Sequence, residues 1–351
     1  MATTVLLLKA SANRVYGQAS YALAGAELAT FAGALDAHWR SERRTLGGVD
    51  YVALDHERPL TADELAVLSN LSSLHAAFTE EGDLLRPVPI DPRAVLSEDI
   101  TTIQRYPGKT NEAFTHLLVN VALAAGGALP RLLAGERLRL LDPACGRGTT
   151  LNRAAVYGMD ACGIELDQRD VEAYTVFLLT WLKDHRLKHK LDQAKLRKGR
   201  DRPAHRITVT YGESKDRRAH RTIDVVHDDT LAARTHWPAR SMDLLVCDLP
   251  YGVQHGAHGS HGPAPTLDRG PAGLLRRALP VWFDLLRPGA GVALAWNRKT
   301  MARGVLEELV LAAGFERAGP GDPEAFVHRV DQAITRDVLV AVRPVPGRGQ
   351  G

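Results

Sequence analysis

The sequence is poor in cysteine and has no long hydrophobic run. Its three cysteines, Cys145, Cys162 and Cys247, have no C-x-x-C or similar spacing, which argues against a disulfide framework and a cysteine zinc site. Each lies in or beside an apolar run, so we expect buried thiols in a reducing, cytoplasmic compartment. No uninterrupted apolar stretch of about 18 residues occurs, so no membrane-spanning helix is expected. The apolar stretch near residue 1 is too short for a secretion signal.

Positive charge is concentrated in one segment of an otherwise acidic chain. The 351 residues, 45% of them hydrophobic and 24% charged, can bury an ordinary core in one large domain or two unequal ones. The formal net charge is +3, yet residues 183–221 alone hold fourteen Lys or Arg against five Asp or Glu. Two interpretations stay open for this basic segment: a solvated, partly helical insertion, or a surface that faces a polyanion such as RNA.

Hydrophobic periodicity predicts two domains. Residues 1–95 read as a small α/β domain for substrate binding. Helices are expected at 21–39 and at 61–68, the second capped by Thr61, and strands at 4–8, 49–54, 74–79 and 84–90. A linker rich in Pro, Asp and Ser follows at 87–99. Residues 96–345 form a second domain in which strands and helices alternate, with the basic segment 183–221 as an insertion. Its first helix, 110–127, has Thr110 or Asn111 as its cap. This alternation predicts a doubly wound, mostly parallel, Rossmann-like α/β sheet.

A glycine turn follows the first strand of the second domain. The strand ends at Asp142, and Gly146 and Gly148 follow, which lets the backbone turn sharply and approach a ligand. Glu165 ends the next strand, at the spacing typical of an acid that holds ribose hydroxyls. The third glycine of the dinucleotide fingerprint is missing, which argues against NAD and for a nucleoside ligand without a pyrophosphate.

The stretch "LLDPACGRGTTLNRAAVYG…GIELD" resembles the cofactor-binding half of class I S-adenosylmethionine-dependent methyltransferases. The resemblance implies S-adenosyl-L-methionine as the cofactor. It also implies that the glycine turn faces the methionine moiety, that the acid after the second strand holds the ribose, and that an acid after the third strand faces the adenine. Carried over, these cofactor-binding residues are Asp142, Pro143, Cys145, Gly146, Gly148 and Thr149, then Glu165 and Leu166, then Asp228 or Asp229 with Thr230.

The tetrapeptide Asp248-Leu249-Pro250-Tyr251 closes the fourth strand of this domain. It resembles the (Asp/Asn/Ser)-x-Pro-(Tyr/Phe) motif of methyltransferases that modify planar amino groups. Such an amine is a poor nucleophile because its lone pair is delocalised. Asp248 and the carbonyl of Leu249 would accept its two N–H bonds and stabilise developing positive charge. Pro250 would fix the carbonyl, and Tyr251 would stack on the base. These four residues are the predicted catalytic set, and the transfer needs positioning but no metal.

Within these enzymes the chain resembles the tRNA guanine-N2 methyltransferases that carry a THUMP domain and a UPF0020-like catalytic domain. The Asp-x-Pro-(Tyr/Phe)-Gly form, the "GKTNEAFTHLLVNVAL" helix and the basic segment support this over residues 101–340. The first ninety residues resemble that family's ferredoxin-like domain but leave no room for a full THUMP module. We therefore expect N-methylation of an exocyclic base amine, with guanine N2 in tRNA or other structured RNA as substrate. The alternatives are a DNA amino-methyltransferase, a peptide or small-molecule N-methyltransferase, and a catalytically silent nucleic-acid-binding protein.

Several further patterns are weaker. His255, His258 and His261 lack ligand partners at metal spacing, so we expect a flap over the bound base rather than a metal site. "PGKT" at 107–110 lacks the earlier glycine of a phosphate loop, although Arg105 and Lys109 are candidates for contact with substrate phosphate. We expect the tryptophans Trp237, Trp282 and Trp296 in the core. The oligomeric state stays open.

Overall fold

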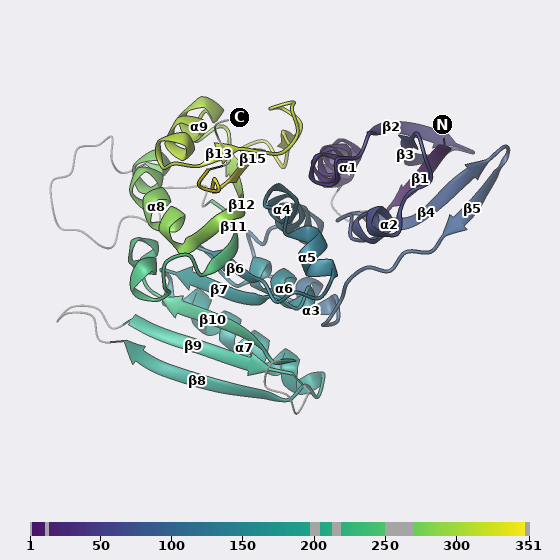
Figure 1. Cartoon of the computed structure of the whole chain (residues 1–351). Helices are drawn as coiled ribbons and strands as arrows, with labels where there is room; N and C mark the ends of the chain where they lie inside the picture. Colours follow the sequence, from purple (N-terminus) through teal and green to yellow (C-terminus); the bar gives the residue numbers. More distant parts are fainter. Residues whose placement is uncertain (1, 11–13, 197–203, 213–218, 250–269, 348–351) are drawn as a thin grey trace.

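Two β-sheets organise the chain (Figure 1). The structure is a computed structural model that describes residues 2–10, 14–196, 204–212, 219–249 and 270–347. A small five-stranded sheet belongs to the first 88 residues, and a larger ten-stranded sheet belongs to the rest. Among the described residues no helix has the length and apolarity needed to cross a membrane.

The small sheet has the ferredoxin-like arrangement expected from the sequence. Its strand order is β2-β3-β1-β4-β5, and every neighbouring pair is antiparallel. The first four strands and two helices follow the β-α-β-β-α-β order of that fold, and β5 is an addition at the edge. Helix α2 begins at the predicted cap, Thr61, which forms a capping box with Glu64. The elements are β1 (Ala2–Leu8), α1 (Arg14–Leu35), β2 (Trp39–Leu46), β3 (Val49–His56), α2 (Ala62–Ser69), β4 (Leu74–Glu81) and β5 (Leu84–Val88).

The large sheet is doubly wound, as predicted. Its order is β13-β15-β12-β11-β6-β7-β10-β9-β8, with β14 paired to β15. The five central strands, β12 to β10, are parallel, and the outer strands are antiparallel. Its strands are β6 (Arg139–Asp142), β7 (Asp160–Glu165), β8 (His189–Leu196), β9 (Ala204–Tyr211), β10 (Arg221–His227), β11 (Met242–Asp248), β12 (Leu286–Asn297), β13 (Glu316–Arg317), β14 (His328–Arg329) and β15 (Thr335–Val342).

Helices cover both faces of the large sheet (Figure 1). Alternate strand residues divide between two cores, so that Leu140 packs toward α4, α6 and α7 while Leu141 packs toward α8, α9 and η2. Trp237, Trp282 and Trp296 are buried in the second core, which confirms their predicted place. The helices are α3 (Asp99–Thr102), α4 (Glu112–Ala125), α5 (Leu129–Leu133), α6 (Thr149–Val156), α7 (Gln168–Asp184), η2 (Thr230–Thr235), α8 (Pro271–Leu285) and α9 (Arg303–Ala312).

Helix α4 joins the two sheets. It packs on β12 of the large sheet on one side and on α1 of the small domain on the other (Figure 1). A Cβ atom added to Gly291 of β12 would lie 1.8 Å from the carbonyl oxygen of Ala122, so only glycine permits this approach. Because α4 runs antiparallel to the parallel strands, its first residues lie at their carboxyl ends. Asn111 caps it, by accepting from the amides of Ala113 and Phe114.

A buried polar network holds the small domain against α4. The carboxyl group of Glu27, on α1, accepts hydrogen bonds from the Ser72 amide at 3.0 Å and from Asn120 Nδ2 at 2.6 Å. Tyr157 donates to Asn120 Oδ1 at 2.6 Å, and His116 Nε2 therefore donates to the Tyr157 oxygen at 2.5 Å. Burial raises the pKa of Glu27 to about 7, although its hydrogen bonds oppose that shift.

Two regions differ from the sequence-based expectation. The described part of the basic segment is not helical beyond the end of α7. It forms the antiparallel hairpin β8–β9, which extends the sheet beyond β10. Strand β2 was missed as well. Both β2 and β8 carry charged side chains on exposed surfaces, which hide the alternating pattern by which strands are recognised.

The raised pKa of Glu27 predicts a specific pH dependence of stability. An unfolded-state carboxyl has a pKa near 4.5, so this group contributes stability below that pH and loses it as pH rises through about 7. Glu27→Gln keeps the neutral hydrogen-bonding form at every pH. We expect wild type to lose up to about 3 kcal/mol relative to Glu27→Gln between pH 4.5 and 8. Urea unfolding at both pH values measures this. Parallel profiles would contradict it, and Glu42→Gln at an exposed position is the matched control.

Candidate active site

The polar candidates of the sequence meet at one edge of the large sheet. From β6 the chain builds β7 and β10 on one side and then returns to place β11 on the other side of β6. Ligands of open α/β sheets bind at such a switch point, outside the carboxyl ends of the strands. Asp142, Glu165 and Asp248 stand at the carboxyl ends of β6, β7 and β11.

The two glycines of the turn between β6 and α6 have different surroundings. Open space lies beside Gly146, whereas the Tyr174 ring packs against Gly148. Gly146 and Gly148 both have left-handed backbone angles, with φ of 50° and 77°. A Cβ atom on Gly148 would lie 2.3 Å from the ring of Tyr174, whereas one on Gly146 would have nothing within 4 Å. The Gly146 amide donates to Glu165 Oε2 at 2.8 Å, and the Asp167 amide donates to Oε1 at 2.8 Å. Glu165 therefore holds the turn, and open space remains beside Gly146.

The other predicted residues of the turn are buried and pack beneath its backbone, on the side of the protein core. Pro143 and Cys145 are buried, and the Cys145 amide donates to the Ile164 carbonyl at 3.0 Å. Thr149 is buried too, and its hydroxyl lies 2.9 Å from the Tyr106 hydroxyl. Burial raises the pKa of Cys145 well above its usual value, so this thiol stays protonated.

Three carboxyl groups make the carboxyl edge acidic. Burial raises the pKa of Asp142 to about 7, and the nearby charges of Glu165 and Asp248 raise it further. Hydrogen bonds from Thr150 and from the Ala144 amide act in the opposite direction. Such a cluster favours a positively charged ligand, because a cation would stabilise the ionised carboxylates. S-adenosylmethionine carries a sulfonium and an ammonium, so the acidic edge and the space at Gly146 fit this cofactor.

The third group of predicted cofactor-binding residues, those expected near the adenine, follows β10. Asp228 pairs with His236 Nε2 at 2.7 Å and accepts from the Asp229 amide, while Asp229 caps η2 through the Leu231 amide. The Thr230 hydroxyl accepts from the indole of Trp282 at 2.9 Å. Leu166, directly after Glu165, exposes 41% of its surface. Both aspartates thus have protein partners at the carboxyl end of β10.

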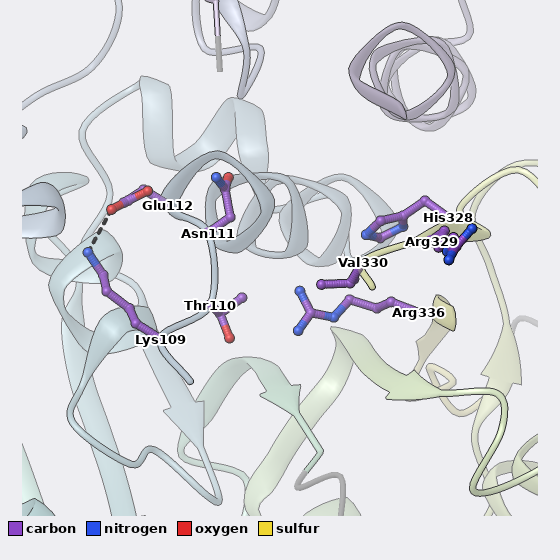
Figure 2. A pocket seen from close by; sticks show the side chains of 8 residues that line it. All are labelled: Lys109, Thr110, Asn111, Glu112, His328, Arg329, Val330 and Arg336. Atoms are coloured by element: carbon purple, nitrogen blue, oxygen red, sulfur yellow. Dashed lines mark hydrogen bonds and ion pairs between the residues drawn. The ribbon is translucent and has the colours of Figure 1, made fainter. Parts of the chain in front are cut away.

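Asp248 is oriented by two residues that the sequence did not reveal. Thr110 donates its hydroxyl to Asp248 Oδ2 at 2.5 Å, and Arg336 Nη2 lies 3.4 Å from the same oxygen. The Asp248 side chain keeps 17% exposure, while that of Arg336 keeps 7%. The position of Thr110 before α4 indicates a helix cap, but Asn111 takes that role. Figure 2 shows the Arg336 side chain extending toward Thr110.

The rest of the tetrapeptide is described in part. Leu249 is buried, and its amide donates to the Ala295 carbonyl of β12 at 2.8 Å, which continues the sheet past Asp248. Pro250 and Tyr251 lie outside the described residues, as do His255, His258 and His261. Among the residues that the structure describes, no group of three or more His, Cys, Asp or Glu could hold a metal ion.

One protein family matches the part of the chain that carries Asp142, Glu165 and Asp248. Residues 129–262 match the family described as UPF0020, RMKL-like, methyltransferase domain. This segment is similar to the methyltransferase domain of that family. The protein is an S-adenosylmethionine-dependent methyltransferase. No curated protein matches the chain.

Solved methyltransferase structures are also similar to the chain, at a distance. An rRNA methylase from Streptococcus thermophilus is 9% identical, with 60% of this chain and 88% of that chain covered and a TM-score of 0.33. A methyltransferase from Pyrococcus furiosus is 13% identical (69% and 88% covered, TM-score 0.36). Magnesium protoporphyrin IX methyltransferase from Synechocystis, solved with bound S-adenosylmethionine, is 14% identical (68% and 86% covered, TM-score 0.36). Likenesses of this size do not discriminate between substrates.

The two glycines of the methyltransferase turn should respond differently to alanine. Gly148→Ala should lower the free energy of unfolding by about 2–4 kcal/mol, because a left-handed backbone angle and overpacking against Tyr174 add. Gly146→Ala carries only the backbone strain of about 1–2 kcal/mol, yet its Cβ enters the open space and should weaken S-adenosylmethionine binding at least tenfold. Urea unfolding and a cofactor titration measure both effects. Equal destabilisation by the two substitutions would contradict this account of the turn.

Thr110 should act on turnover through the orientation of Asp248. Thr110→Val removes the donor to Oδ2 with little change in volume, so kcat should fall about tenfold to hundredfold as the carboxylate loses its fixed position. The dissociation constant for S-adenosylmethionine should stay within about twofold of wild type. Thr110→Ser keeps the hydroxyl and should restore most of the rate. If Val and Ser variants behave alike, Thr110 does not position Asp248.

Proposed function

We propose that this methyltransferase modifies an exocyclic amino group of a nucleic-acid base, and that its substrate is guanine N2 in tRNA or another structured RNA. The observation that carries the proposal is the oriented carboxylate of Asp248 at the switch point, beside a glycine turn that fits the cofactor. A carboxylate in this place suits an amine that must release a proton.

The residues divide the work of the reaction. When bound, S-adenosylmethionine supplies an electrophilic methyl group. Gly146 and Glu165 hold the cofactor side, with Asp228 or Asp229 at the adenine. Asp248 accepts one N–H of the target amine, and the Leu249 carbonyl accepts the other. The cofactor would give its methyl group to the nitrogen lone pair and keep the electrons of the C–S bond on sulfur, while Asp248 or water would take the amine proton. Pro250 and Tyr251 complete the set, as the tetrapeptide resemblance implies.

Thr110 and Arg336 prepare Asp248 for this task. Both contact Oδ2 and so hold the carboxylate in one orientation. A fixed acceptor needs no reorganisation when charge develops, which is the main source of electrostatic catalysis.

Exposed positive charge supports RNA as the substrate class. The structure describes seven basic residues of segment 183–221, and two of them form hydrogen bonds that stabilise the fold. Arg206 pairs with Asp224, and Arg221 donates to the Gly158 carbonyl. Five are exposed: Lys183, Arg186, Lys188, Lys190 and Lys195. We assign this surface and the small domain to holding the polyanion. The three cysteines are free and buried, in keeping with a cytoplasmic site of action.

The test is nucleoside mass spectrometry with deuterated-methyl S-adenosylmethionine and separate pools of unmodified tRNA, ribosomal RNA and DNA. Labelled N2-methylguanosine in an RNA pool is the expected result. Label only in DNA would move the assignment to the DNA amino-methyltransferases, and no label in any pool would overturn a nucleic-acid substrate.

Asp248→Ala should abolish transfer while leaving the cofactor bound. We expect turnover to fall at least about a thousandfold, because the acceptor that stabilises the charged amine is lost. Cofactor affinity should stay within a few-fold of wild type, as measured by titration calorimetry. Substantial retained turnover would remove Asp248 from the catalytic set.

A further inference from the structure

A pocket opens beside Asp248, between the start of α4 and the β14–β15 hairpin (Figure 2). None of the glycine-turn residues 143–148 lines it, so it is separate from the cofactor side. Two of its residues, Thr110 and Arg336, are those that contact Asp248 Oδ2. The pocket and the proposed amine site therefore adjoin at this carboxylate. The lining residues are Lys109, Thr110, Asn111, Glu112, His328, Arg329, Val330 and Arg336.

The charge of the pocket is positive. Lys109 Nζ is held by Glu112 Oε1 at 2.6 Å and by the Thr101 carbonyl at 2.7 Å, so this pair is neutral. Glu112 is the single acid of the lining. Two guanidinium groups remain, and that of Arg336 pairs with Asp248, which lies outside the lining. The charge of Arg329 is therefore the one left over. Burial lowers the pKa of His328, so its ring is neutral near pH 7 and adds no charge.

The wall that carries Arg336 is rigid. The Arg336 guanidinium lies 4.7 Å from the centroid of the Phe114 ring, and the His328 ring lies 5.0 Å from the same ring. His328 Nδ1 donates to the Phe326 carbonyl at 2.9 Å, and His328 pairs with Arg336 in the β14–β15 ladder. Arg329 is exposed at the rim, with its Nε bonded to the Asp331 carbonyl at 3.1 Å. A buried, stacked guanidinium loses little freedom when an anion binds.

We propose that this pocket binds a backbone phosphate of the nucleic-acid strand that carries the target base, with Arg336 at its floor and Arg329 at its rim. The proposal rests on the proposed function and adds a subsite to it. Guanidinium groups match phosphate oxygens in a fork geometry and bind them more strongly than neutral donors do. A phosphate held here would fix the strand next to Asp248, so that the base amine enters in one orientation.

Arg329→Gln tests the subsite, because Arg329 lines the pocket but does not contact Asp248. The probe is whichever nucleic-acid pool the wild-type protein labels. At about 0.15 M KCl the variant should bind this nucleic acid about tenfold more weakly, as expected for the loss of a charge-assisted hydrogen bond. The slope of log Kd against log[KCl] should shrink by about 0.7–0.9, the contribution of one phosphate contact. Cofactor affinity, measured alongside, should match wild type.

Two further variants separate a phosphate contact from a general loss of charge or fold. Arg317→Gln removes an arginine that is 52% exposed on β13, outside the pocket, and should leave affinity and slope at wild-type values. Arg329→Lys keeps the charge without the fork and should restore the slope and part of the affinity.

The outcomes distinguish the subsite from the function. If wild type methylates nucleic acid but Arg329→Gln and Arg317→Gln both keep its affinity and slope, the subsite is wrong and the function stands. If wild type labels no nucleic-acid pool, both fail. Label on a peptide pool, with weaker peptide binding by Arg329→Gln, would assign the pocket to a carboxylate and overturn the phosphate.

Discussion

Helix α4 sets the geometry on which the rest of the molecule depends. Every side chain from Phe114 to Ala124 is buried, because the helix lies between the small domain and the large sheet. Its far end is locked by the approach of Ala122 to Gly291, where no side chain fits. Its middle is tied to α1 through Asn120 and Glu27. Its near end is thereby fixed at the carboxyl edge, where Thr110 reaches Asp248. A single packed helix thus positions both the domain junction and Asp248, the proposed catalytic carboxylate.

The same edge concentrates negative charge at the expense of stability. Asp142, Glu165 and Asp248 stand at the ends of neighbouring strands, and Asp142 is buried deeply enough that its pKa rises to about 7. Uncompensated carboxylates destabilise the folded protein, and a cationic cofactor offsets that repulsion when it binds. Arg336 compensates Asp248 from the side of the β14–β15 hairpin. The two sides of Asp248 therefore differ in charge. Carboxyl groups lie toward the glycine turn and favour a cation, whereas the arginines of the pocket lie toward the β14–β15 hairpin and favour an anion.

The basic segment shows how a charged insertion joins a folded sheet. Its strands pair with β10, and Arg206 compensates Asp224 inside that junction while Arg221 bonds the Gly158 carbonyl. The outer strand β8 keeps its lysines exposed, which also protects a sheet edge from pairing with other chains. Of these exposed charges, Lys195 lies nearest the carboxyl edge, opposite His205 in the ladder.

The sequence alone determined most of the strands and helices, though not β2 or the hairpin β8–β9, and it also determined the two domains as a prediction, the glycine turn, and the acids at the strand ends. These features depend on local patterns, namely period, caps and the residue types that a turn or a strand end requires. Thr61 capped its helix as expected, and the tryptophans lay in the core. The tertiary structure decided the rest. Thr110 and Arg336 meet at Asp248 only because α4 and β15 flank the same edge, and Thr110 lies 138 positions from its partner. Strand order and helix packing create such contacts, and no local pattern encodes them.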